Sequence, residues 1–209
     1  PGQTVITAED GSLINGQAGG TNIVPEIVLN GELTIVHSQL TQPGVTLDYD
    51  YPISGSGTLN IQGKGGSNAD LNVANTFAGL KITEPSAGGI GVDVRAQAAG
   101  SLGSGDVTVE ADASGTPAGD LIINAADAMA DTGSLNLNGA ENSTLITMNA
   151  DDTVGFLTVN GTARPAGTYG SSGSGATNEV DWISGGGILT VAGANDPGSL
   201  TVDFAGVGE

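Results

Sequence analysis

Apolar and polar residues alternate in short runs along most of the chain. The alternation is clear in Leu59-Asn60-Ile61, Val107-Thr108-Val109 and Leu135-Asn136-Leu137. A period of two places successive side chains on opposite faces of a strand, so one face is buried and the other is solvated. The pattern predicts strands over residues 4–7, 26–29, 32–37, 45–49, 57–62, 70–73, 80–83, 91–94, 106–110, 120–124, 134–138, 144–149, 155–160, 187–192 and 199–204.

Clusters of Gly, Asn, Asp, Ser and Pro separate these strands. Asn30-Gly31, Gly88-Gly89 and Asn138-Gly139 are examples, and such pairs supply the positive φ that tight turns require. Only residues 124–131 have a helix-like composition, and a segment that short has a propensity that context easily overrides. The chain is therefore expected to be all-β.

The composition favours a repetitive fold with a thin core. The 209 residues include 36 Gly but only one Trp, three Tyr and three Phe, and 38% of residues are hydrophobic. Val, Leu, Ile and Ala suit small repeated core layers, and Gly and Asn suit stacked corners. These features predict a parallel β-helix, or β-solenoid, with coils of about 20 to 25 residues. A β-sandwich or jelly roll is the alternative.

The charge is strongly negative, with 23 acidic residues against four basic ones and a formal net charge of −19. Such a surface repels phosphate backbones and anionic headgroups, so we expect neither nucleic-acid binding nor membrane insertion. It keeps β-rich surfaces apart and attracts divalent cations. The chain has no Cys, which is compatible with export, and its start at Pro1 without Met is typical of a processed product.

Residues 54–110 carry three Gly-containing motifs in succession. Ser54-Gly55-Ser56-Gly57-Thr58-Leu59 precedes Asn75-Thr76-Phe77-Ala78-Gly79, and Leu102-Gly103-Ser104-Gly105-Asp106-Val107 follows. This segment resembles the autotransporter-associated β-strand repeat of bacterial passenger proteins. The resemblance implies a right-handed parallel β-helix displayed outside the cell.

The C-terminal part is similar to the terminal module of secreted β-helix proteins with such repeats. That resemblance implies that Ala166-Gly167-Thr168-Tyr169-Gly170 is a loop and that Gly187-Ile188-Leu189-Thr190-Val191 contains the final strand. The predicted organisation is a solenoid body over residues 1–192, with a terminal module over 154–192. Residues 193–209 are expected to be a C-terminal tail or strand arm.

Several side chains are candidates for chemistry. His37 shares a predicted face with Leu33 and Ile35, so we expect a satisfied, partly buried His rather than a catalytic one. Asp48 with Asp50, and Asp151 with Asp152, place oxygen ligands close together and are candidate calcium ligands. Solvated carboxylates in turns are the alternative, and no other cofactor is expected.

The predicted function is a structural one, and the chain is not expected to be an enzyme. The terminal strands are candidates for assembling the protein with itself, head to tail, into an extracellular fibre or surface layer. The candidate assembly residues are Thr4, Val5, Ile6, Leu200, Val202 and Phe204.

Two other classes stay open. An adhesin or module that binds surface glycans would present an exposed aromatic patch near Tyr169 and Trp182. A polysaccharide-degrading β-helix enzyme would need paired carboxylates in a groove lined with aromatic platforms. The few aromatic residues make the enzyme the weaker alternative.

Overall fold

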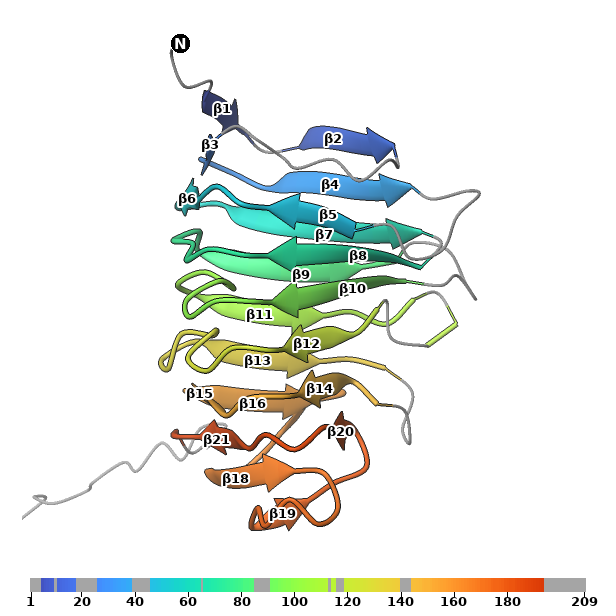
Figure 1. The fold of residues 1–209 in the computed structure, drawn as a ribbon, viewed down its shortest axis with the longest axis vertical. Coiled ribbons are helices and arrows are strands. Elements are labelled where there is room, and N and C mark those ends of the chain that lie inside the picture. Colours follow the sequence, from blue (N-terminus) through green and yellow to red (C-terminus); the bar gives the residue numbers. More distant parts are fainter. Residues whose placement is uncertain are drawn as a thin grey trace, which may run out of the picture.

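The computed structural model describes residues 5–9, 11–17, 26–38, 46–64, 66–84, 91–112, 114–115, 119–139 and 144–193. The side chains of Val5, Ile6, Ser38, Lys64 and residues 12–17 are outside that description. The described residues form twenty-one strands and no helix. The chain winds into coils that stack in one column, from β2 at the N-terminal end to β19 at the other (Figure 1).

The strands form four sheets. In spatial order, the three-stranded sheet contains β1 (Val5–Ala8), β3 (Glu26–Leu29) and β6 (Ile53–Gly55). The eight-stranded sheet contains, in the same way, β17 (Thr162–Ala163), β16 (Phe156–Val159), β13 (Ser134–Leu137), β11 (Asp106–Val109), β9 (Gly79–Thr83), β7 (Thr58–Lys64), β4 (Leu33–Ser38) and β2 (Ser12–Gln17). The six-stranded sheet contains β20 (Ile183–Ser184), β14 (Ile146–Met148), β12 (Leu121–Ile123), β10 (Val92–Ala96), β8 (Ser67–Leu71) and β5 (Thr46–Tyr49). The four-stranded sheet contains β15 (Asp152–Val154), β21 (Leu189–Val191), β18 (Gly167–Gly170) and β19 (Asn178–Glu179).

Parallel pairing between successive coils confirms the predicted parallel β-solenoid. In the eight-stranded sheet, β2, β4, β7, β9, β11, β13 and β16 pair in parallel, each with the strand one coil away. The coils differ in length, from the step between Leu59 and Leu80 to the longer step between Val107 and Leu135. A β-sandwich or jelly roll is built from antiparallel strands, so that alternative is wrong.

The core is a set of stacked apolar columns, because in-register parallel pairing repeats each inward position one coil further on. One column contains Leu33, Leu59, Leu80, Val107, Leu135 and Leu157. A second contains Ile35, Ile61, Ile82, Val109, Leu137 and Val159. All of these side chains are buried. The sheet faces on the opposite side of each strand carry the polar residues, as the alternation predicted.

One corner of the solenoid is built from glycines that allow adjacent coils to touch through their backbones. Gly57 N–H donates to the Leu29 carbonyl, and Gly155 N–H donates to the Gly133 carbonyl, both at 2.9 Å. A Cβ atom at Gly57 would lie 2.0 Å from the Gly31 oxygen. A Cβ atom at Gly105 would lie 1.8 Å from the Ala78 oxygen. This close approach accounts for part of the high glycine content.

Antiparallel pairs enter the column at its C-terminal end, beside the short parallel edge strands β19 and β20. β17 folds back on β16 through the two-residue turn Asn160-Gly161, in which both φ angles are positive. β21 pairs in parallel with β15 on one side and antiparallel with β18 on the other. The expected loop at 166–170 is therefore wrong in part, because Gly167–Gly170 forms β18. The final strand is confirmed at Leu189–Val191.

The segment with a helix-like composition, residues 124–131, does not form a helix. It forms turns, and Asp127 takes a φ of 55° there. Among the described residues, no helix is long and apolar enough to span a membrane.

Candidate functional site: a polar ladder and the two ends of the solenoid

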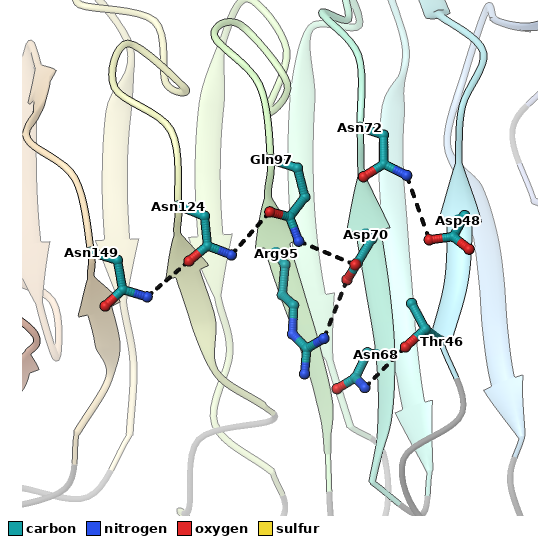
Figure 2. Close-up of polar contacts among 9 residues, drawn as sticks. All are labelled: Thr46, Asp48, Asn68, Asp70, Asn72, Arg95, Gln97, Asn124 and Asn149. Atoms are coloured by element: carbon teal, nitrogen blue, oxygen red, sulfur yellow. Dashed lines mark hydrogen bonds and ion pairs between the residues drawn. The ribbon is translucent and has the colours of Figure 1, made fainter.

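The outer surface of the six-stranded sheet carries columns of polar side chains. We call this surface the ladder face (Figure 2). Strand alternation points these residues outward, and parallel register stacks them at the spacing between strands, about 4.8 Å. The ladder face consists of Thr46, Asp48, Asp50, Asn68, Asp70, Asn72, Arg95, Gln97, Asn124 and Asn149.

Side-chain hydrogen bonds on the ladder face all run in one direction. Asn149 Nδ2 donates to Asn124 Oδ1 at 2.8 Å, and Asn124 Nδ2 donates to Gln97 Oε1 at 3.1 Å. Gln97 Nε2 in turn donates to Asp70 Oδ2 at 3.1 Å. Each amide therefore donates to the coil on its N-terminal side. Like amide ladders in stacked β-structures, this arrangement ties coil to coil without apolar contact.

Carboxylates accept at the N-terminal end of the ladder face. Asn72 Nδ2 donates to Asp50 Oδ1 at 2.8 Å and approaches Asp48 Oδ1 at 3.5 Å. Asp48 and Asp70 are direct register neighbours. Burial raises the pKa of Asp70, the Gln97 hydrogen bond and Arg95 lower it, and the nearby Asp48 charge raises it. The Arg95 guanidinium, 3.6 Å from Asp70 Oδ1, partly offsets this crowding of negative charge.

The two candidate calcium pairs lie in separate places. Asp48 lies on β5 and Asp50 directly follows it, whereas Asp151 and Asp152 lie at the start of β15. Within the described ranges, no group of three or more His, Cys, Asp or Glu side chains is arranged to hold a metal ion. Calcium binding by either pair stays a prediction.

Asp151 and Asp152 together hold the C-terminal module to the coil before it. Asp152 Oδ2 accepts the N–H groups of Ala128 and Met129 at 3.0 and 3.1 Å. Asp151 Oδ1 accepts the N–H of Ile188, which precedes β21, at 2.8 Å. Burial raises the pKa of Asp152 to about 6, against the lowering effect of its backbone hydrogen bonds. Their carboxylates therefore act as backbone acceptors in the structure.

His37 is buried inside the solenoid. Its Nε2 lies 2.8 Å from the Tyr49 hydroxyl, and the two rings are stacked. Desolvation lowers the pKa of His37 to about 4 and raises that of Tyr49. The imidazole is therefore neutral at pH 7. The expectation of a buried, satisfied His is confirmed in part, because Nε2 contacts Tyr49 whereas Nδ1 is buried without a hydrogen-bond partner among the described residues.

His37 and Asp152 predict opposite pH dependences of stability. The unfolded chain protonates His at its usual pKa of 6.5 but the folded protein only near 4, so stability is lost as the pH falls through this window. Asp152 has a pKa of about 6 in the folded protein and its usual pKa of 3.8 in the unfolded chain. As the pH falls, the folded protein therefore binds the proton before the unfolded chain does, and the folded state gains stability.

We therefore expect the His37→Gln variant to gain stability relative to the native chain, by about 2 kcal/mol, between about pH 7 and about pH 5. Asp152→Asn is the matched control and should lose relative stability, by about 1 kcal/mol, over the same interval. Urea unfolding at each pH measures both. Parallel pH profiles for the native chain and the His37→Gln variant would refute the lowered pKa of His37 as a source of pH-dependent stability.

The aromatic patch expected of a glycan-binding module is absent from the place predicted. Tyr169 and Trp182 are 3% and 9% exposed, and their ring centroids lie 6.0 Å apart. The Tyr169 hydroxyl donates to the Pro165 carbonyl at 2.8 Å. These rings seal the end of the core instead of facing solvent, so the expectation of an exposed patch there is wrong. Phe156 and Tyr51 are the exposed large hydrophobic residues of the described chain.

The candidate assembly residues divide between the two ends of the chain. Val5 and Ile6 lie on β1, which pairs with β3 through Val5–Glu26 and Ile6–Ile27. β1 is the outermost strand of its sheet among the described residues, as β2 is of the eight-stranded sheet. Thr4, Leu200, Val202 and Phe204 lie outside the described residues.

The ladder itself was missed at the sequence level, although a signal for it exists. Asp50, Asn72, Gln97, Asn124 and Asn149 each directly follow a strand of the six-stranded sheet. An amide or acidic residue that recurs directly after every second or third strand indicates that these side chains stack on one another in successive coils. No family model matches the chain, and no curated protein or solved structure matches it.

Proposed function

We propose that this chain is a non-catalytic structural protein outside the cell, which associates with itself end to end by adding a β-strand to β1. The observation that carries the proposal is the difference between the two ends. At the C-terminal end, the antiparallel strands β17 and β18 and the Tyr169–Trp182 pair cover the core, and the parallel edge strands β19 and β20 are only two residues long. At the N-terminal end, β1 and β2 are parallel edge strands of four and six residues. An edge strand is a template for pairing with another chain.

The backbone direction identifies which groups of β1 would accept a new strand. The Ala8 carbonyl accepts the N–H of Asn30 at 2.8 Å, so the Ala8 backbone points toward β3. Successive residues of a strand direct their backbone groups to opposite edges, so the N–H and carbonyl of Thr7 point to the outer edge. Thr7 is also exposed.

The sequence supplies a strand to add. Residues 199–204 alternate apolar Leu200, Val202 and Phe204 with Ser199, Thr201 and Asp203. This is the period of a strand with one apolar face. We propose that this segment of one copy pairs with β1 of the next, which produces a head-to-tail chain of subunits.

A Thr7→Pro substitution tests this assignment. Proline removes the N–H and is tolerated on an edge strand, so folding should be retained while strand addition is blocked. Thr7→Val is the matched control, because it keeps the N–H at the same exposed position. In about 0.15 M salt, where charge repulsion is screened beyond about 8 Å, sedimentation velocity should show oligomers for the control and monomers for Thr7→Pro. Deleting residues 195–209 should also leave monomers. Equal oligomerisation of all three proteins would refute the proposal.

A further inference from the structure

Three polar side chains from three successive coils converge on the outer face of the eight-stranded sheet. Lys81 on β9 and Asn60 on β7 are direct register neighbours, and Glu32 precedes β4 one coil further toward the N-terminus. β4, β7 and β9 lie side by side in the column (Figure 1). Lys81 Nζ contacts Glu32 Oε2 at 2.7 Å. Asn60 belongs to the coil between them, and the Glu32 carboxylate reaches both the lysine ammonium and the Asn60 amide nitrogen.

The Asn60 amide is held at both of its ends. Its Nδ2 donates to Thr34 Oγ1 at 3.3 Å and approaches Glu32 Oε1 at 3.5 Å. Its Oδ1 accepts a hydrogen bond from Thr83 Oγ1 at 2.8 Å. Asn60 itself is only 8% exposed. The amide is therefore fixed in place, and its carbonyl oxygen is polarised by a hydroxyl donor.

We propose that Lys81 and Asn60 form an isopeptide cross-link between adjacent coils. The arrangement holds the components of an acyl transfer: a nucleophilic amine, an amide carbon, a carboxylate that contacts both nitrogens, and a donor to the carbonyl oxygen. The cross-link does not depend on the self-assembly proposed above.

The step balances without a co-reactant. Glu32 accepts a proton from the Lys81 ammonium, and the resulting amine attacks Asn60 Cγ to form the new C–N bond. The negative charge that develops on Asn60 Oδ1 is stabilised by the Thr83 hydroxyl. Glu32 returns its proton to Nδ2, the Oδ1 carbonyl re-forms as the Cγ–Nδ2 bond breaks, and the nitrogen leaves as ammonia. The Lys81 nitrogen loses its second proton, which Glu32 passes to the ammonia to give ammonium. The products are one secondary amide and one ammonium ion.

The geometry also determines how fast this reaction is. The side chains of Lys81 and Glu32 are 44% and 37% exposed, so water competes for both charges. This competition should make the reaction slower than it would be at a site buried from solvent. The product would close a covalent loop across one coil, which restricts the unfolded chain as a disulfide does.

Mass spectrometry of the whole protein tests the inference. After prolonged incubation in neutral and mildly alkaline buffer, the intact mass should fall by one ammonia, and proteolysis should yield a branched peptide that joins residues 60 and 81. Glu32→Gln should slow the reaction by about 100-fold, since the base is lost. Thr83→Val should slow it by about 10-fold or more.

Lys81→Arg is the decisive control, because arginine keeps the charge beside Glu32 but does not form the amide. The ammonia loss should disappear in this variant. An unchanged intact mass in both buffers would overturn the inference. So would an ammonia loss that persists in Lys81→Arg or maps to an Asn-Gly pair such as Asn30-Gly31, because cyclisation at those pairs releases ammonia without joining two coils.

Discussion

Replacing Gly105 with alanine should destabilise the solenoid by about 3 kcal/mol or more. The added methyl group would lie 1.8 Å from the Ala78 carbonyl oxygen and 2.8 Å from the Ala78 carbonyl carbon. Both are backbone atoms of the preceding coil, so no side-chain rotation relieves the clash. The coils would have to separate at this corner, which would weaken the neighbouring pairing of β9 with β11.

Gly186→Ala is the matched control for this substitution. A Cβ atom at Gly186 would meet no atom within 4 Å, and neither Gly105 nor Gly186 has a positive φ that alanine would resist. Thermal unfolding followed by circular dichroism should show a large decrease in Tm for Gly105→Ala and little change for Gly186→Ala. Similar Tm values for the two variants would contradict the claim that the close approach of adjacent coils requires glycine at position 105.

Trp182→Ala should destabilise the C-terminal module by about 3 to 5 kcal/mol. The indole is 9% exposed and packs on Tyr169, and the Trp182 carbonyl accepts the N–H groups of Leu145 and Ile146 at the end of the last coil. Removing the ring leaves a cavity where the apolar core ends. Stability in a solenoid is close to a sum of local coil terms, so the loss should stay near this end.

Hydrogen exchange distinguishes this local effect from global unfolding. In Trp182→Ala, amides of β15, β18 and β21 should exchange faster, while those of β4 and β7 should stay protected. Phe156→Ala removes an aromatic ring that is 41% exposed and should change stability by less than about 1 kcal/mol. If instead Trp182→Ala left stability unchanged and abolished binding to a glycan, the adhesin alternative would be restored.

Much of the fold could be predicted from local pattern because the period of two is a local property. Glu26–Leu29 has the predicted bounds, and β4, β11, β13 and β16 lie within a residue or two of theirs. β2 and β18 were missed because Gly16 in one and Gly167 with Gly170 in the other interrupt the apolar alternation. Alternation alone therefore predicts where a regular strand lies. A short strand that contains glycine forms through its pairing with neighbouring strands, which the local sequence does not reveal.

The candidate site was less predictable, because its geometry depends on register between coils of unequal length. The step from Asn60 to Lys81 is shorter than the step from Thr108 to Asn136. A repeat of constant length read from the sequence would therefore not predict that Glu32, Asn60 and Lys81 lie together. In the same way, Asp151 and Asp152 were recognised as a close acidic pair. Their backbone partners Ala128, Met129 and Ile188 are brought to them only by the stacking of coils.

Electron microscopy of the native chain over a series of concentrations tests the proposed function most directly. Assembly by strand addition at β1 predicts filaments that lengthen with concentration and have the solenoid axis along the filament. Isolated single rods at every concentration, or rods that associate only side by side, would contradict the proposal that the end of the solenoid is the assembly surface.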